Sequence, residues 1–508
     1  MTWRIVRKDC AQLWPLLTIV TVAQLANAAM WLALGPFREP RGLVTVASLF
    51  SGATMLGMAA LVVAVVQQDV LPGVSQDWLV RPIRRSDLLR AKLTFMVLLV
   101  QGPALLADLA HGLAAGFAFR DVLIAGLSRS TLMVLVFELP VFAIAAMTST
   151  LVQVAASMLA MWVVVVAGVF VGILARAGAP PVFAGSGLQW MTPAFWSVLA
   201  SVAAAVIIPL QYFRRATRRS RQLAVGAVLV APMLSSSTWD SAFSVQRRLS
   251  ANSATALPIA IEFDRSLGKD VAEPPSVSVN RVSLPLRVSG LPPESLVVND
   301  RAEARIVDHE GTTLFRGRTT TTLGYGDDFV VRTAEGGDVR LHQRIALPGD
   351  VYARVRGRAV RLEIDYALTL FRLDAPMAIA AINGDQRSSA LGRCQTKLDA
   401  DGDEIELGCV SSGAAPTCVS ITLEHPTTGQ RNPPTGACDP DYSPYPAHFY
   451  PDALSQFGFA VPFRDRQRLA QYPVGGSQLG ESTLIVKSYR PVAHFTRRLA
   501  VADIRLDE

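Results

Sequence analysis

Signatures of catalysis and of nucleotide binding are missing from this 508-residue sequence. It contains no G-x-x-x-x-G-K-[ST] segment, so the chain does not supply a P-loop ATPase of its own. The second half has neither the G-x-S-x-G elbow of serine hydrolases nor the H-E-x-x-H helix of zinc proteases. We therefore expect no catalytic residue, no metal ion and no other cofactor in this chain.

Cysteine is scarce and unevenly placed. Cys10 stands alone near the start, and the other four of the five cysteines lie between Cys394 and Cys438, with no Cys-x-x-Cys pair that would favour zinc. Four cysteines in a polar region predict two disulfides, and hence an oxidising compartment. Three pairings are open, of which the most local is Cys394–Cys409 with Cys418–Cys438.

Charged residues are absent from two long stretches of the first half, Leu43 to Val66 and Leu93 to Ala107. Hydrophobic residues make up 51% of the chain and its mean hydropathy is +0.33, which is more apolar than soluble domains are. A helix needs about 20 mostly apolar residues to cross a bilayer. Such runs predict about seven membrane helices within 13–236: 13–34, 43–66, from Asp87 or Lys92 to Phe117, 131–150, 153–174, 192–212 and a short seventh at 222–234.

The segments between these helices carry the topological information. Residues 1–12 mix apolar and basic side chains, which predicts a separate interfacial helix on the inner membrane surface. Residues 120–129 are expected to form an outer turn. The segment 67–92 is a basic island with Arg81, Arg84, Arg85, Arg90 and Lys92, and a second basic cluster, FRRATRRSR, covers 213–221. By the positive-inside rule both face the cytoplasm.

Orientation then follows from counting. A cytoplasmic N-terminus and seven crossings put everything after Ser236 outside, where the cysteines independently predict an oxidising compartment. We expect a multi-pass protein of the bacterial inner (plasma) membrane with a periplasmic or extracellular C-terminal domain. The net charge is +7, and the basic residues cluster beside the apolar runs. This placement fits contacts with membrane lipids and predicts no nucleic-acid partner.

The second half has the pattern of an all-β domain. After a linker at 237–260, stretches such as VSVNRVSLPLRV and DVYARVRGRAVRLEIDYALTLF alternate apolar and polar residues within 261–508. This period of two, with turn residues between the stretches, predicts an extracytoplasmic antiparallel sandwich with disulfides. The fold class is therefore a helical transmembrane bundle of six or seven helices followed by an all-β domain.

The basic island also carries a family resemblance. The pattern W-L-x-R-P-I-x-R-x-x-L-L-x-A-K, from Trp78 to Lys92, resembles the cytoplasmic hinge of type-2 ABC exporter permeases. WRIVRKD at 3–9 resembles that family's amphipathic start, and MTSTLVQ at 147–153 its short inner link between helices four and five. The resemblance covers residues 1 to about 215, whereas the seventh helix and the outer domain are additions to the family's core.

The resemblance implies a transport subunit rather than an enzyme. A separate cytoplasmic ABC ATPase dimer would bind ATP and Mg, and a second permease copy, identical or paralogous, would enclose the path. The residues expected to couple to the ATPase are Trp78, Arg81, Pro82, Arg84, Arg85, Leu88 and Lys92. Two alternatives stay open: an ATPase-coupled complex that transmits motion to a periplasmic partner, and a membrane-anchored extracytoplasmic binding or assembly protein.

Three polar residues within the apolar runs are candidates for the translocation path. Glu138 lies mid-helix, where a carboxylate is costly and is expected to face the bundle interior with a partner. The alternative is a structural carboxylate that is hydrogen-bonded to a neighbouring helix. Asp108 and His111 are three residues apart and share a helix face, so they form either a polar rim at the outer mouth or a simple contact with headgroups and water.

Two features of the outer domain allow more than one interpretation. LDADGDEIEL at 398–407 resembles part of a calcium loop, but its Asp-Gly between apolar runs favours a hairpin. Aromatic residues including Tyr445, Phe449 and Tyr450 crowd a proline-rich stretch. They form either a surface for a substrate or a periplasmic partner, or the packed core of a long loop.

Overall fold

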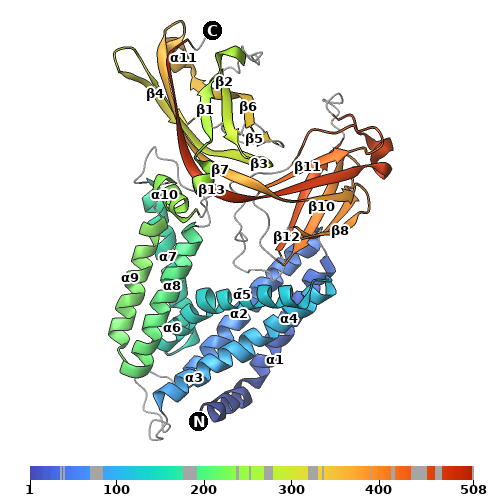
Figure 1. Ribbon diagram of the computed structural model, residues 1–508. Helices are drawn as coiled ribbons and strands as arrows, with labels where there is room; N and C mark the ends of the chain where they lie inside the picture. Colours follow the sequence, from blue (N-terminus) through green and yellow to red (C-terminus); the bar gives the residue numbers. More distant parts are fainter. Residues whose placement is uncertain are drawn as a thin grey trace.

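The computed structural model describes residues 1–34, 37, 41–68, 84–174, 191–235, 239–250, 253–267, 279–318, 330–333, 337–389, 391–412, 418–435, 455–463 and 472–505. Within them a bundle of helices is followed by a region of antiparallel sheets (Figure 1). The β region lies over one end of the bundle, and the N-terminus lies near the other. The predicted fold class is confirmed.

Ten helices make up the helical half of the described chain, three of them continued by a short π-helical segment (η). They are α1 (Thr2–Leu34), α2 (Arg41–Gln67), α3 (Arg85–Phe95) with η2 (Met96–Val100), α4 (Gln101–Ala114), α5 (Phe119–Met133) with η3 (Val134–Glu138), α6 (Leu139–Met147), α7 (Leu151–Leu174), α8 (Met191–Pro209) with η4 (Leu210–Arg214), α9 (Thr217–Ser235) and α10 (Trp239–Leu249).

Six helical segments of the described chain are long and apolar enough to cross a membrane: Thr2–Leu34, Gly42–Gln67, Arg85–Ala114, Phe119–Met147, Leu151–Gly168 and Ala194–Arg214. The predicted seventh helix exists as α9, but it is not one of the six, because arginines 218, 219 and 221 occupy its first turns. It nevertheless packs along α7 and α8 and runs beside them towards the β region (Figure 1).

Two boundaries differ from the prediction. The interfacial helix expected at 1–12 is not separate: it continues into the first membrane helix as α1, with Pro15 inside the helix. The outer turn expected at 120–129 is also wrong, because α5 begins at Phe119. Its charges mislead the sequence interpretation, since Asp121 lies in the first helical turn and Arg129 pairs with Asp108 of α4.

The π segments leave backbone carbonyl groups that other helices satisfy. A π segment interrupts the regular i to i−4 hydrogen bonding, so the carbonyl groups around it need other donors. Gln24 of α1 donates its amide to the Val100 carbonyl at 3.0 Å, and the Ser201 hydroxyl of α8 donates to the Leu135 carbonyl at 2.8 Å. Polar side chains therefore tie both segments into the bundle.

The β region contains three described antiparallel sheets. Its strands are β1 (Ala260–Phe263), β2 (Val279–Leu291), β3 (Ser295–Val307), β4 (Thr313–Arg318), β5 (Val330–Thr333), β6 (Gly337–Pro348), β7 (Val360–Ala380), β8 (Asp385–Ser388), β9 (Gly392–Leu398), β10 (Glu404–Ser411), β11 (Cys418–Glu424), β12 (Ser455–Pro462) and β13 (Thr483–Ile504). The strand orders are β1-β2-β6, β12-β10-β9-β8 and β11-β13-β7-β3-β4, with β5 beside β3. The short helix α11 (Gly349–Val355) connects β6 to β7.

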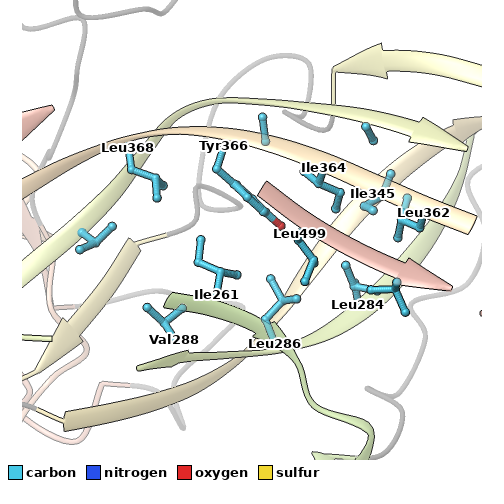
Figure 2. Packing of buried hydrophobic residues seen from close by; sticks show 14 of the residues in the cluster. Ile261, Leu284, Leu286, Val288, Ile345, Leu362, Ile364, Tyr366, Leu368 and Leu499 are labelled. Carbon is cyan, nitrogen blue, oxygen red and sulfur yellow. The ribbon is translucent and has the colours of Figure 1, made fainter. Parts of the chain in front are cut away.

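The predicted sandwich is built as two lobes that share two long strands. β7 and β13 have 21 and 22 residues and pair along almost their whole length. In lobe 1, sheet β1-β2-β6 packs on the first half of β7 and the second half of β13, around Leu286, Ile364 and the buried Tyr366 (Figure 2). In lobe 2, sheet β12-β10-β9-β8 packs on β11 and the other halves of the long strands. The alternation of apolar and polar residues predicts the strands, but it does not predict that a single strand packs in two hydrophobic cores.

Lobe 2 contains the predicted disulfide and the predicted hairpin. Cys394 and Cys409 are directly opposite on β9 and β10, and they are bonded. Cys418 is disulfide-bonded as well, whereas Cys438, its predicted partner, lies outside the described residues. Between β9 and β10 the Asp399 carboxylate accepts the backbone N–H of Asp403 and Glu404, which confirms the hairpin.

Candidate functional site

One end of the bundle is basic. Arg84, Arg85 and Arg90 are exposed around the start of α3, and the Arg85 guanidinium donates to the Phe213 carbonyl at 2.6 Å. That bond joins the basic island to the second basic cluster, 128 positions away in the sequence. We call exposed Arg84, Arg85 and Arg90, with exposed Arg214 and Arg215, the basic end. Trp78, Arg81 and Pro82 of the predicted coupling set lie outside the described residues.

Beneath the basic end, two of the predicted coupling residues are buried. Lys92 of α3 is fully buried and its ammonium lies 2.8 Å from the Asp9 carboxylate of α1, which is also fully buried. Leu88 packs one turn earlier in the same hydrophobic core. Lys92 and Leu88 therefore connect the basic end to α1 rather than presenting side chains to a partner. The sequence pattern does not identify Asp9, because a lone carboxylate directly after the basic residues Arg7 and Lys8 is typical of a surface helix.

Glu138 and Gln101 form a buried polar pair inside the bundle. Glu138 is fully buried at the end of η3, and the Gln101 amide donates to one of its carboxyl oxygens at 2.5 Å. Gln101 is the first residue of α4, immediately after η2. Both partners thus lie beside a π segment, and such segments are frequent at functional sites. Among the described residues the other Glu138 oxygen has no hydrogen-bond partner.

Further polar residues lie on α1 and α2. Gln24 is buried beside Val100, next to Gln101 in sequence, and one turn along α1 the Asn27 amide oxygen accepts from the Ser51 hydroxyl of α2 at 2.7 Å. Trp31 donates its indole N–H to the same hydroxyl. These hydrogen bonds hold α1 against α2 and α3–α4 within apolar surroundings. The prediction that Glu138 faces the interior with a partner is consistent with this arrangement, while its role in a path stays a prediction.

Asp108 of α4 contacts α5. Its carboxylate forms an ion pair with the Arg129 guanidinium, with both side chains largely buried. Close packing of α4 on α5 makes this contact, because a Cβ at Gly112 would lie 2.4 Å from Val122. His111 is half-buried one turn away. The structure therefore pairs Asp108 with Arg129 and places His111 one turn further along α4, whereas Glu138 contacts Gln101 at the start of that helix.

The opposite end of the bundle meets lobe 2. The Arg387 guanidinium of β8 donates to the Gly116 carbonyl between α4 and α5 at 2.7 Å. Gly116 has a positive φ of +81°, and a Cβ there would lie 2.1 Å from the Arg387 guanidinium. Lys397 of β9 lies over the Phe37 ring, between α1 and α2, at 4.7 Å from its centroid. The edge of lobe 2 thus contacts two loops at the end of the bundle away from the basic end.

These features define what the described residues can do chemically. They contain no group of three or more His, Cys, Asp or Glu side chains arranged to hold a metal ion. The candidate aromatic surface, with Tyr445, Phe449 and Tyr450, lies outside the described residues. No protein-family model and no curated protein matches this chain. The features of the described chain that bear on function are therefore the basic end, the buried polar pairs and the contact with lobe 2.

Proposed function

We propose that this chain is the permease subunit of an ATP-driven ABC exporter that works with a separate cytoplasmic ATPase. ATP and Mg would bind to that partner, and this chain would provide the membrane path. The observation that carries the proposal is that two basic segments, far apart in sequence, meet at one end of the bundle while the β region contacts the other. Clustered arginines at one end of a membrane bundle mark its cytoplasmic side.

The buried ion pair gives the basic end a means of moving the bundle. A load applied to Arg84 and Arg85 acts on α3, and the Asp9–Lys92 pair links α3 to α1. Separating a buried ion pair is costly, so the two helices move together rather than apart. Motion of the basic end would then reach Gln24 on α1 and Gln101, which begins α4 beyond α3 and η2 and is hydrogen-bonded to Glu138.

We propose that a second copy of this chain, or a paralogue, encloses the path with it. Three polar side chains would then face the path between the two copies rather than the lipid, and would provide polar contacts along it: Glu138, Asp108 and His111. Polar residues within membrane segments face bundle interiors or water-filled cavities, which supports this placement. The subunit would reside in the bacterial inner membrane, with its N-terminus cytoplasmic and its two lobes periplasmic.

Charge reversal at the basic end tests the proposal. Arg84→Glu with Arg85→Glu is expected to reduce co-purification of a P-loop ATPase at least tenfold, because the basic end would then repel an acidic docking surface. Arg120→Glu, an exposed arginine at the start of α5 near Gly116, is the matched control and should leave co-purification unchanged. Equal recovery of an ATPase by both variants would contradict the docking assignment.

A second candidate function, transmission of motion to a periplasmic partner, is favoured by the contact with lobe 2. Arg387 and Lys397 hold the loops at Gly116 and Phe37, so displacement of α1 or α4 would displace lobe 2. The two candidates differ in what stimulates ATP hydrolysis. A compound that is exported should stimulate the ATPase in proteoliposomes, whereas a purely transmitting complex should respond only to its periplasmic partner.

A further inference from the structure

A pocket of about 530 Å³ lies where α10 meets lobe 1. One wall is α10, which presents Phe243, Ser244 and Arg247, and the floor is the sheet of β3, β7 and β13. The strand register sets the floor in two cross-strand rows. Glu303, Asp365 and Arg498 form one row, and Arg301, Ala367 and Thr496 form the next.

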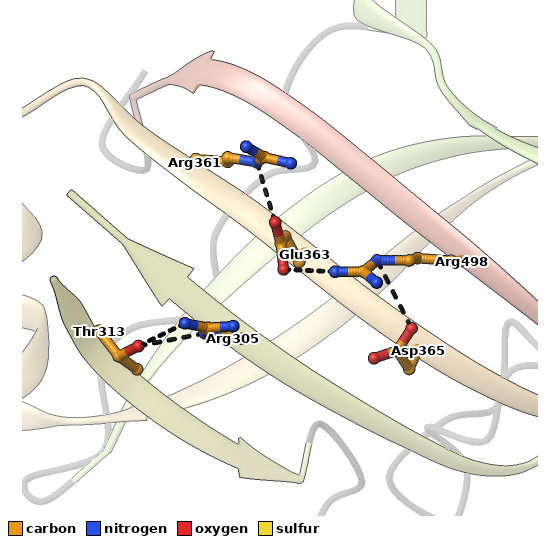
Figure 3. Close-up of polar contacts among 6 residues, drawn as sticks. All are labelled: Arg305, Thr313, Arg361, Glu363, Asp365 and Arg498. Carbon is orange, nitrogen blue, oxygen red and sulfur yellow. Dashed lines mark hydrogen bonds and ion pairs between the residues drawn. The ribbon is translucent and has the colours of Figure 1, made fainter. Parts of the chain in front are cut away.

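The pocket has more positive than negative charge. Four arginines line it, at 247, 301, 497 and 498, against the carboxylates of Glu303 and Asp365. Those carboxylates are already engaged, since Glu303 lies 2.6 Å from the Arg316 guanidinium and 3.7 Å from that of Arg301. Asp365 lies 3.8 Å from the Arg498 guanidinium, which also contacts Glu363 at 2.7 Å (Figure 3). An anionic ligand would therefore not have to displace a free carboxylate.

Two of the arginines supply the excess charge. Among the described residues no carboxylate lies within 4.0 Å of Arg247 or Arg497. The Arg247 guanidinium is exposed and donates to the Thr496 hydroxyl at 3.3 Å. Arg497 donates to the backbone carbonyl groups of Ala256 and Ile259, at 2.5 and 2.6 Å, so its charge is hydrogen-bonded but not neutralised. Arg247 keeps several N–H groups for a ligand, because a guanidinium has five.

The pocket also lies close to the helical bundle. α10 begins at Trp239, soon after α9 ends at Ser235, and it lies between the bundle and lobe 1 in Figure 1. Three apolar side chains next to the pocket are exposed: Val245, Leu249 and Leu257, the last two at 70% and 74%. Exposed apolar residues on an amphipathic helix beside a membrane bundle are typical of contact with the lipid interface.

We propose that this pocket binds a phosphate group, either the phosphodiester of an anionic lipid headgroup or the phosphate of a soluble ester. Guanidinium groups match phosphate geometry with paired N–H donors, and Arg247, Arg301 and Arg498 reach the pocket from three different elements. Phe243 and Ala367 provide an apolar wall for the carbon atoms attached to the phosphate. The site lies between α10 and lobe 1 and does not depend on the proposed transport function.

The test uses the full chain purified in uncharged detergent. Native mass spectrometry counts bound dioleoyl phosphatidylglycerol against phosphatidylcholine, and thermal unfolding is followed with inorganic phosphate and glycerol phosphate. The variants are Arg247→Gln, which removes the hydrogen bond to the Thr496 hydroxyl, and Arg247→Gln with Arg498→Gln. Arg354→Gln on α11, an exposed arginine that pairs with Asp350, is the control.

We expect the double variant to bind phosphatidylglycerol, or inorganic phosphate and glycerol phosphate, at least tenfold more weakly than the control, and Arg247→Gln about threefold more weakly. Binding should also weaken as the salt concentration rises from about 50 to about 500 mM, because salt screens the attraction between exposed charges. Loss of phosphatidylglycerol alone identifies a lipid as the source, and loss of the phosphate or glycerol phosphate effect identifies a soluble ester. Equal binding by Arg247→Gln and the control overturns the proposal. So does the combined result of no preference for phosphatidylglycerol over phosphatidylcholine and no effect of inorganic phosphate or glycerol phosphate on thermal unfolding.

Discussion

Replacing Lys92 by methionine is expected to destabilise the helical bundle by about 3–5 kcal/mol, because it removes the buried ammonium that lies 2.8 Å from the buried Asp9 carboxylate, whereas the ammonium of the exposed Lys8 lies 4.0 Å away. Methionine keeps much of the volume of lysine, so the loss reports the missing charge rather than a cavity. The measurement is unfolding of the detergent-solubilised chain in increasing denaturant. Arg90→Met, an exposed residue on the same helix, is the matched control and should change stability by less than about 1 kcal/mol.

The second partner makes this prediction specific. Asp9→Leu with Lys92→Met removes both charges and should recover most of the lost stability, since replacing a buried ion pair with apolar residues is often neutral or stabilising. If Lys92→Met and Arg90→Met had equal effects, the pair would not hold α1 to α3. In the proposed complex with the ATPase, the double variant should fold but transmit less motion from α3 to α1, because helices joined by apolar contacts slide past each other more easily than helices joined by an ion pair.

Removing the Cys394–Cys409 disulfide is expected to destabilise lobe 2 by about 3 kcal/mol. The bond closes a loop of 15 residues, and a loop of that length restricts the unfolded chain by about this amount. Both cysteines are fully buried in the core of lobe 2, so alanine is the appropriate replacement at each. Hydrogen exchange of the full chain should show faster opening of β9 and β10, with little change in lobe 1.

Cys10→Ala provides the control for that experiment. Cys10 is the free cysteine of the described chain and is half-buried in α1, away from both lobes. It should leave exchange in lobe 2 unchanged. Unchanged exchange in β9 and β10 after removal of the bond would show that the hydrophobic core alone holds the hairpin.

Much of the fold follows from the sequence, because its periodicities are strong. The charge-free runs at Leu43–Val66 and Leu93–Ala107 lie within helices, and the alternating stretches form strands. The neighbouring cysteines pair as the hairpin at 398–404 predicts. These features are local, so a window of 10 to 20 residues contains the information that decides them.

The site could be predicted less well, because its contacts join distant segments. Lys92 has the sequence context of an exposed basic cluster, and only the approach of α1 shows that Asp9 neutralises it. Arg129 reads as part of a polar turn until α5 packs on α4 and brings it to Asp108. Similarly, no local pattern shows that β7 and β13 serve two cores, or that Arg387 reaches Gly116 from 271 positions away.

The most direct measurement of the central claim is the composition and mass of the particle that this chain forms in native membranes. The tagged full chain would be extracted in mild detergent, purified and analysed by native mass spectrometry. We expect a particle with two permease chains and two copies of a P-loop ATPase, and we expect the Arg84→Glu, Arg85→Glu variant to lose the ATPase. A particle without any nucleotide-binding subunit under gentle extraction would contradict it, and the two lobes would then become the place to look for function.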